Sequence, residues 1–377
     1  METIERFLKI DRQSFFLLGP RGTGKSTLVR KAFPDALYID LLLPDVFRNY
    51  AAYPERLRET VNAHREKRTV VLDEVQKAPQ LLEVVHSLIE EKRRIQFIMT
   101  GSSARKLRRG GVNLLAGRAL MKYLHPFMAA ELKGLFDLEK ALKVGLMPLV
   151  IDSEDPVATL QAYVNLYLRE EVQMEGLTRN MGNFSRFLDS VSFSHGAALN
   201  VSNVARECRI ERKVVEGYIG ILEDLLLAYR IPVFTRRAKR ATASHPKFYF
   251  FDAGIFNILR SSGPLDRPEE KSGAALEGLV AQNIRAWIDY GRSECKLYYW
   301  RTVSGSEVDF VVYGKGVFQA IEVKNSTTIH PQDIRPLKAF GEDYPEAETF
   351  LVYRGKEKLS RDGVSIMPVT ELLLGMR

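Results

Sequence analysis

The chain has 377 residues, of which 45% are hydrophobic and 27% charged, and its formal net charge is +8 at pH 7. This length exceeds the size at which one hydrophobic core keeps growing, so we expect two or three domains in a soluble globular protein. Two cysteines and six scattered histidines exclude a disulfide framework and a histidine-rich metal site. No apolar run approaches the ~20 residues that span a bilayer, and residues 1–13 lack the apolar core of a secretory signal, which favours a cytoplasmic protein.

The first expected element is a buried strand that runs through a glycine-rich turn into a helix. SFFLLGPRGTGKSTLVRKAF (14–33) contains the complete phosphate-loop pattern. Backbone amides in such a loop surround phosphates, and the helix N-terminus adds the positive end of its dipole. We expect Lys25 to contact the β- and γ-phosphates of ATP and Ser26 to ligate Mg²⁺. The residues predicted to bind the nucleotide are Gly19, Pro20, Arg21, Gly22, Thr23, Gly24, Lys25, Ser26 and Thr27.

A second strand, TVVLDEVQ (69–76), ends in two acids. Four apolar residues followed by acids are typical of a buried parallel strand whose carboxyl end meets the nucleotide. Asp73 is expected to hold Mg²⁺ through water, and Glu74 to polarise the water that attacks the γ-phosphate.

A third strand, RIQFIMTGSS (94–103), ends in hydroxyl groups. Thr100, Ser102 or Ser103 would sense the γ-phosphate, or a serine would cap the helix that follows. Arg118, in LLAGRAL, would neutralise charge in the transition state for hydrolysis, with an ordinary surface arginine as the alternative.

The order GPRGTGKSTL, VVLDEVQKAPQLLEVV, FIMTGSSARKL, LLAGRAL, LHPF and GLMPLV resembles the prokaryotic AAA-type P-loop ATPases that carry a C-terminal domain of unknown function. The resemblance covers most of the chain and implies an ATPase domain over residues 1–150. It also implies that a Gly-x-Pro-like element, here Gly145 to Pro148, packs on the nucleotide base. The common pattern has a second glycine where this chain has Leu146.

Residues 151–265 are predicted to form a helical connector and a winged helix. Apolar residues at helical spacing mark a connector over 157–178. Ser202 would cap a short helix that ends near Cys208, a longer helix would follow, and KFYFFD (247–252) would close a β-wing. The buried face of the longer helix is expected to hold Val214, Val215, Tyr218, Ile221, Leu222 and Leu225.

Basic residues in this region favour a nucleic-acid partner, DNA rather than RNA. RKLRR (105–109) and RRAKR (236–240) are dense basic clusters. The start of the longer helix, which would be the recognition helix, holds Glu211, Arg212 and Lys213. A solvated basic surface and a winged helix that packs only on protein are the alternatives. The predicted nucleic-acid contacts are Arg212, Lys213, Arg236, Arg237, Lys239 and Arg240.

Residues 266–377 are predicted to form an α/β domain. KSGAALEGLVAQNIRAWI (271–288) and HPQDIRPLKAF (330–340) have helical spacing. The expected strands are KLYYWRT (296–302), the hairpin 307–324, FLVYRG (350–355) and VSIMPV (364–369).

Glu277, Asp309, Glu322 and Lys324 occur in the order helix, strand, strand, which resembles the PD-(D/E)xK core of restriction-endonuclease-like enzymes. The three carboxylates would bind Mg²⁺, the metal would lower the pKa of a bound water, and Lys324 would orient that water. The alternative is that these residues are the polar ends of half-buried strands, on a scaffold without activity.

The register of the hairpin decides whether this site can form. If Tyr313 pairs with Phe318, Asp309 and Glu322 stand opposite each other on one face, and Val308, Phe310 and Val312 are buried. If Tyr313 pairs with Val317, Asp309 turns to the other face unless a bulge restores it.

Two functions remain open from the sequence. In the first, Mg²⁺-dependent ATP hydrolysis is coupled to nucleic-acid binding and metal-dependent phosphodiester cleavage. In the second, the chain is a regulatory ATP switch whose middle and C-terminal domains only bind DNA or a protein partner. The sequence leaves the nucleic-acid substrate, the pathway and any homo-oligomer undecided.

Overall fold

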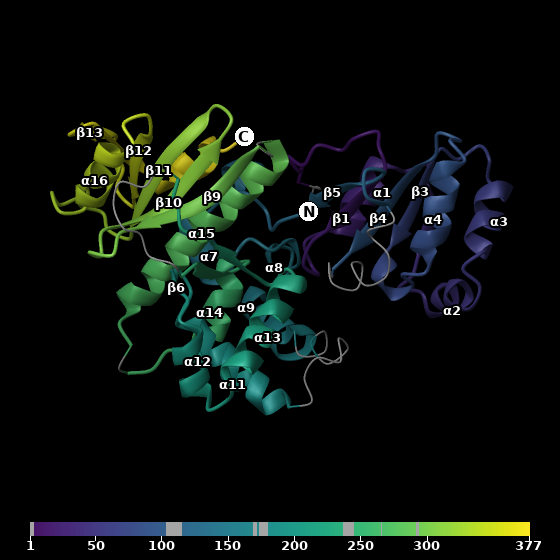
Figure 1. The fold of residues 1–377 in the computed structure, drawn as a ribbon, viewed down its shortest axis with the longest axis horizontal. Coiled ribbons are helices and arrows are strands. Elements are labelled where there is room, and N and C mark those ends of the chain that lie inside the picture. The colour runs from purple at the N-terminus through teal and green to yellow at the C-terminus, as the bar shows by residue number, and fades with distance from the viewer. Residues whose placement is uncertain are drawn as a thin grey trace. The chain divides into compact units, whose positions relative to one another are not determined.

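The computed structural model describes residues 4–102, 115–168, 172, 180–236, 245–264, 266–291 and 294–377 (Figure 1). Contacts divide the chain into two compact units. The first contains residues 8–125 and 224–227, and the second the described residues of 1–7, 126–223 and 228–377. The expected ranges 1–150, 151–265 and 266–377 divide the chain differently, and as independently folding domains they stay a prediction. Across the described ranges, no helix is long and apolar enough to cross a membrane.

The first unit is built on a five-stranded parallel sheet with the order β2-β3-β4-β1-β5. Because the order of strands reverses at β1, the carboxyl end of this strand is where ligands bind in sheets of this kind. The α/β fold class expected for this part of the chain is therefore confirmed. The strands are β1 (Phe15–Leu18), β2 (Leu37–Asp40), β3 (Thr69–Asp73), β4 (Gln96–Gly101) and β5 (Leu120–Tyr123), and the helices are α1 (Lys25–Ala32), α2 (Pro44–Ala52), α3 (Arg56–Ala63) and α4 (Leu81–Glu90).

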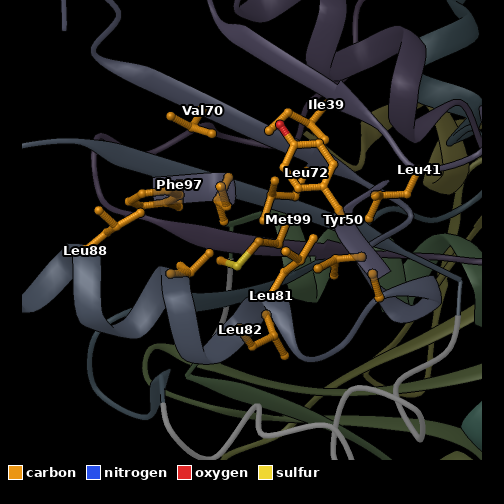
Figure 2. Close-up of a cluster of buried hydrophobic side chains, with 14 of the residues drawn as sticks. Ile39, Leu41, Tyr50, Val70, Leu72, Leu81, Leu82, Leu88, Phe97 and Met99 are labelled. Atoms are coloured by element: carbon orange, nitrogen blue, oxygen red, sulfur yellow. The ribbon is translucent and has the colours of Figure 1, made fainter. Parts of the chain in front are cut away.

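One face of this sheet packs on α4 and α2, as Figure 2 shows. Alternate residues of neighbouring strands, such as Val70 and Leu72 or Phe97 and Met99, point to the same face and meet leucines of α4. Every residue of β1 is buried, as expected for a strand covered on both sides. This packing fixes the carboxyl ends of β1, β3 and β4, from which the expected nucleotide site extends.

The second unit begins with short helices. An N-terminal segment is tied to them, because Arg6 forms an ion pair with buried Glu131 and the backbone N–H of Phe7 donates to the same carboxylate. Arg6 and Phe7 thus join the N-terminal segment to the helices of this unit. The helices are α6 (Ala129–Leu132), α7 (Leu138–Val144), α8 (Pro148–Ile151) and α9 (Pro156–Ala162), followed by a π-helical turn (Tyr163–Leu168).

The middle of the second unit has helices alternating with a small antiparallel sheet of order β6-β8-β7. Asn200, and not Ser202 as expected, caps α12, since its side chain accepts a hydrogen bond from the backbone of Asn203. On α13, Val214 is exposed and Ile219 is buried, which corrects the predicted face. The elements are α11 (Met181–Ser192), β6 (Ala197–Ala198), α12 (Val201–Cys208), α13 (Arg212–Asp224), β7 (Ala228–Ile231), β8 (Lys247–Phe250) and α14 (Ala253–Leu259).

The C-terminal part of the second unit is a mixed six-stranded sheet of order β13-β14-β12-β11-β10-β9. Tyr313 pairs with Phe318, so the hairpin adopts the register that the site requires, and a bulge interrupts the pairing of β10 with β9 between Val308 and Val311. The strands are β9 (Cys295–Arg301), β10 (Glu307–Gly314), β11 (Val317–Lys324), β12 (Glu348–Tyr353), β13 (Leu359–Arg361) and β14 (Val364–Pro368), and the helices are α15 (Pro268–Gly291), α16 (Arg335–Asp343) and α17 (Val369–Gly375).

Phe234 joins the middle region to this sheet. Its backbone N–H donates to the carbonyl of Tyr299 at 2.7 Å, and the N–H of Tyr299 donates to the carbonyl of Pro232 at 3.1 Å. Its ring is buried among the rings of Tyr313, Phe318 and other aromatic residues of the C-terminal core. The segment from Pro232 to Phe234 thus runs beside β9, and Phe234 is part of the hydrophobic core of the C-terminal sheet.

Candidate functional site

The phosphate loop lies between β1 and α1, and its glycines adopt conformations that other residues rarely take. Gly22 and Gly24 have φ values of 83° and 86°, in the left-handed region. A Cβ atom on Gly19 would lie 2.4 Å from the carbonyl oxygen of Leu124. The loop thus has the backbone shape that lets consecutive N–H groups face a bound anion.

Lys25 begins α1 and its side chain lies along the loop. The Nζ atom donates to the carbonyl oxygens of Gly19 and Pro20 at 2.9 and 3.2 Å, and it is 4.0 Å from the carboxylate of Glu74. The side chain is 4% exposed. A buried ammonium group held against loop carbonyls is close to the place where phosphate oxygens would lie.

Asp73, at the end of β3, is the centre of a network of hydroxyl groups. Ser26 donates to its Oδ1 atom at 3.0 Å, Thr100 donates to the same oxygen, and Tyr38 donates to Oδ2. Burial and the hydrogen bond to Asp73 raise the pKa of Tyr38, so this phenol stays protonated. The predicted pair of Ser26 and Asp73 is therefore brought together, and Tyr38 is a member that the sequence analysis missed.

This pair fits a Mg²⁺ ion. A hydroxyl and a carboxylate oxygen from adjacent elements are ligands that Mg²⁺ accepts, together with phosphate oxygens and waters. No second carboxylate is needed, because the ion usually keeps several waters.

Glu74 follows Asp73 and turns toward β4. Its backbone has a φ of 59°, in the left-handed region that is strained for such a residue, and its N–H donates to the Thr100 hydroxyl at 2.9 Å. Its carboxylate accepts hydrogen bonds from Gln76 and, at 3.5 Å, from Ser102. Thr100 and Ser102, two of the three expected sensors, thus contact Asp73 or Glu74, and the third, Ser103, lies outside the described residues.

No described contact joins Arg118 or Pro148 to this site. Arg118 is 40% exposed and forms an ion pair with Glu90 of α4. Pro148 begins α8 in the other unit, and its predicted contact with the nucleotide base stays a prediction. Gly145 has another role here, because its φ is 75° and a Cβ atom would collide with buried Asp252, which accepts a hydrogen bond from Leu146.

The second candidate site gathers the carboxylates of the C-terminal sheet around a lysine that the sequence analysis did not single out. Lys247 of β8 is 1% exposed, and its Nζ atom lies 2.9 Å from Glu277, 2.7 Å from Glu307 and 3.0 Å from Asp309. Tyr249, two residues further along β8, donates to Glu277 at 2.6 Å. Two of the predicted metal ligands therefore bind an ammonium group.

Glu322 and Lys324 complete the predicted quartet on β11. Lys324 lies 2.7 Å from Glu322, and the backbone N–H of the intervening Val323 donates to Asp309 at 3.0 Å. The other carboxylate oxygen of Glu322, Oε2, is buried and has no hydrogen-bond partner. The hairpin register thus sets Asp309 opposite Glu322, and Glu277 of α15 meets Asp309 through their shared contact with Lys247.

Burial and mutual repulsion set the charges in this cluster. Burial, and then the nearby Asp309 carboxylate, raise the pKa of Glu277 to about 7 and that of Glu322 to about 8. Burial alone would lower the pKa of Lys247, but its carboxylate neighbours outweigh this effect and hold it above its ordinary value. Lys247 is therefore a permanent positive charge inside the cluster.

The carboxylate cluster does not fit a divalent metal as it stands. Among the residues that the structure describes, no group of three or more His, Cys, Asp or Glu side chains is arranged to hold a metal ion. The reason at this site is that the oxygens of Glu277 and Asp309 converge on the Nζ atom of Lys247. Assignment of Glu277, Asp309 and Glu322 as metal ligands therefore stays a prediction that this arrangement does not favour.

The predicted nucleic-acid contacts lie partly on described residues. Arg212 and Lys213 are exposed in the first turn of α13, where Arg212 pairs with Glu216 at 3.0 Å. Arg236 is exposed, with its guanidinium over the Tyr313 ring. Arg237, Lys239, Arg240 and the RKLRR cluster lie outside the described residues.

Three family models match consecutive parts of the chain. Residues 11–133 match an AAA domain, residues 135–266 match a domain of unknown function (DUF8612), and residues 272–372 match another (DUF4143). The first match supports a nucleotide-binding, ATPase-type function for the unit that holds the phosphate loop.

Relatives with a similar whole length also occur. Uncharacterised proteins of Mycobacterium tuberculosis and Mycobacterium bovis are 26% identical over 368 residues, which is 95% of this chain and 80% of theirs. Among solved structures, domain III of the replication initiation protein DnaA from Thermotoga maritima is 13% identical, with a TM-score of 0.23 over 44% of this chain and 79% of that one. Protein VC1899 from Vibrio cholerae is 12% identical, with a TM-score of 0.22 over 95% and 94% of the two chains. Scores this low establish no shared fold.

Proposed function

We propose that this chain is a Mg²⁺-dependent ATPase that works as a nucleotide-driven switch. The observation that carries the proposal is the network in which Ser26, Thr100 and Asp73 share hydrogen bonds beside Lys25 and Glu74. Lys25 and Ser26 come from α1, Asp73 and Glu74 from the end of β3 and the residue after it, and Thr100 from β4, so three neighbouring elements meet at this end of the sheet. The AAA domain match to residues 11–133 agrees with this proposal.

The roles of these residues follow from their chemistry. Lys25 would leave the loop carbonyls to bind the β- and γ-phosphates, where its charge is better satisfied. Ser26 and Asp73 would hold Mg²⁺, which offsets the charge of the phosphates when it is bound. Glu74 would orient the attacking water. Thr100 would link the position of Glu74 to the presence of the γ-phosphate, because it contacts both Asp73 and the backbone of Glu74.

Two variants of the full-length chain test this function. Lys25→Ala should weaken ATP binding by roughly tenfold to a hundredfold, because it removes charge-assisted hydrogen bonds. Glu74→Gln should keep ATP binding but lower turnover on the order of 10²- to 10⁴-fold, because it removes the base that orients water. Equilibrium binding of ATP and release of phosphate measure the two effects. Full turnover in both variants would refute the proposal.

We also propose that the middle region is a winged helix that binds DNA. The order of its elements, three helices with β6 after the first and β7 and β8 after the third, supports this proposal, as does the exposed basic first turn of α13. Replacing Arg212 and Lys213 together by Ala should weaken DNA binding and reduce the slope of its salt dependence by about 2. Unchanged affinity and slope would leave the region as a protein-packing element.

Cleavage of phosphodiesters by the C-terminal sheet is the weaker candidate function. The pairing of Tyr313 with Phe318 supports a nuclease-like arrangement of Asp309 and Glu322, because it sets them opposite each other. The position of Lys247 opposes it, since the ammonium group lies where a metal would have to bind.

A further inference from the structure

The positive charge in the carboxylate cluster is supplied by the chain itself. Three carboxylates, from α15 and β10, lie within 3.0 Å of the Lys247 ammonium group. Other donors hold these carboxylates in place, because Tyr249 donates to the same Oε1 atom of Glu277 that Lys247 contacts, and the backbone N–H of Val323 donates to Oδ2 of Asp309. The site is therefore an organised cation-binding site whose cation is a side chain.

A divalent metal and this lysine cannot share the site. Mg²⁺ needs carboxylate oxygens at roughly 2.0–2.1 Å from its centre. The oxygens of Glu277 and Asp309 that would reach such a centre are in contact with Nζ. An ammonium group and a dication at this separation would also repel each other strongly in a site with little water.

Lys247 is held in place by the backbone around it. It pairs with Ala198 of β6 on one side and with Ile231 of β7 on the other, so β8 is the central strand of its sheet. Just before it, the carbonyl of His245 accepts a hydrogen bond from Tyr299 of β9. The backbone of Lys247 is therefore fixed on both sides, and its side chain is 1% exposed, so clearing the site requires the side chain to leave its buried position or β8 to move relative to β10.

One carboxylate oxygen of the cluster has no hydrogen-bond partner and is therefore available to a cation. Glu322 is 5% exposed, and one of its carboxylate oxygens has no partner. It stands on the same face as Asp309, since the pairing of Tyr313 with Phe318 sets them opposite each other. Without Lys247, the carboxylates of Glu277, Asp309 and Glu322 would be buried with too little positive charge, which is a strong attraction for a metal ion.

We propose that Lys247 is a built-in ammonium group that takes the place of a divalent metal, so that the C-terminal site is closed to metal ions while the lysine occupies it and opens only when the lysine is withdrawn. The site becomes a divalent-metal site when the lysine is removed. This inference concerns the second unit alone and does not rest on ATP hydrolysis. A failure of the ATPase proposal would leave it intact.

The test is Mn²⁺ binding to the full-length chain without nucleotide, measured by electron paramagnetic resonance. The wild-type chain should show no Mn²⁺ binding that is lost on substitution of Asp309. Lys247→Met should bind about one Mn²⁺ per chain, and the further substitution Asp309→Asn should abolish this binding. Mn²⁺ should raise the unfolding temperature of Lys247→Met and leave that of the wild-type chain unchanged, since the metal would replace the lost charge.

Lys324→Met is the matched control, because it removes a lysine that pairs with Glu322 alone among the carboxylates of the cluster. It should bind no Mn²⁺. Asp309-dependent binding by the wild-type chain, equal binding by Lys324→Met, or a folded Lys247→Met that binds none would each overturn the proposal. If Lys247→Met does not fold alone, folding in the presence of Mn²⁺ supports the proposal, and failure to fold with and without Mn²⁺ overturns it.

Discussion

Two buried lysines, Lys25 and Lys247, mark the two candidate sites, and their surroundings differ. Lys25 donates to loop carbonyls, and its carboxylate neighbour Glu74 is 4.0 Å away. Lys247 is in contact with three carboxylates at 3.0 Å or less. The first arrangement can exchange its partners for phosphate oxygens at little cost, whereas the second has its full complement of negative charge.

An ammonium group in a polar pocket can therefore be either a binding group or a structural counter-ion. A lysine that donates to neutral carbonyls forms stronger, charge-assisted hydrogen bonds when an anion binds. A lysine already surrounded by carboxylates gains nothing from an anion, and its removal leaves uncompensated buried charge. The same residue type therefore predicts ligand binding in one unit and closure of a site in the other.

Replacement of each lysine should change the free energy of unfolding by very different amounts. Lys247→Met should lower the free energy of unfolding by about 3–5 kcal/mol, because it removes one partner of a buried ion cluster. Lys25→Met should change it by about 1 kcal/mol, since it breaks hydrogen bonds mainly to neutral carbonyls. Urea denaturation without nucleotide or metal measures both. Equal losses would show that the two lysines have the same structural role.

A smaller effect concerns pH. The folded pKa of Glu322, raised to about 8 by burial and Asp309, lies above its ordinary value of 4.5. The folded chain thus binds the proton more tightly, so this residue makes stability fall as pH rises from about 4.5 toward 8. Glu322→Gln should flatten that decline, and denaturation at several values from pH 5 to pH 8 measures it. Parallel curves for both proteins would contradict the assignment.

The smallest expected effect is at Arg118, on the surface of the first unit. Because its pairing with Glu90 is exposed, Arg118→Ala should leave the unfolding midpoint almost unchanged. ATP turnover should stay within about twofold of wild type, since no described contact joins Arg118 to the phosphate loop. A loss on the order of a thousandfold would instead assign it a role in neutralising the transition state, as an arginine contributed within or between subunits.

The sequence predicted which residues come together at the first candidate site, because they are close in the chain or end successive strands. The phosphate loop is one contiguous segment. Asp73, Glu74 and Thr100 lie at or just after the ends of apolar runs that are typical of buried strands. Tyr38 was missed because β2 ends in an unremarkable LYID, and nothing local shows that its hydroxyl meets Asp73.

The second site was predicted only in part. The sequence left two hairpin registers open, and the structure adopts the one that sets Asp309 opposite Glu322. Lys247 lies 30 positions from Glu277 and 62 from Asp309, so local pattern could not connect them. A signal did exist, since a lysine at the start of the otherwise apolar strand KFYF must find a carboxylate if it is buried.

The burial of Phe234 in the aromatic core of the C-terminal sheet limits how the chain can be cut. A fragment that begins at residue 266 would lose this ring and the ammonium group of Lys247 together, and would expose a hole in its core beside unneutralised carboxylates. The complementary fragment would carry an unpaired aromatic anchor. Exchange of C-terminal modules between relatives should therefore succeed only when the segment from Phe234 through β8 travels with them.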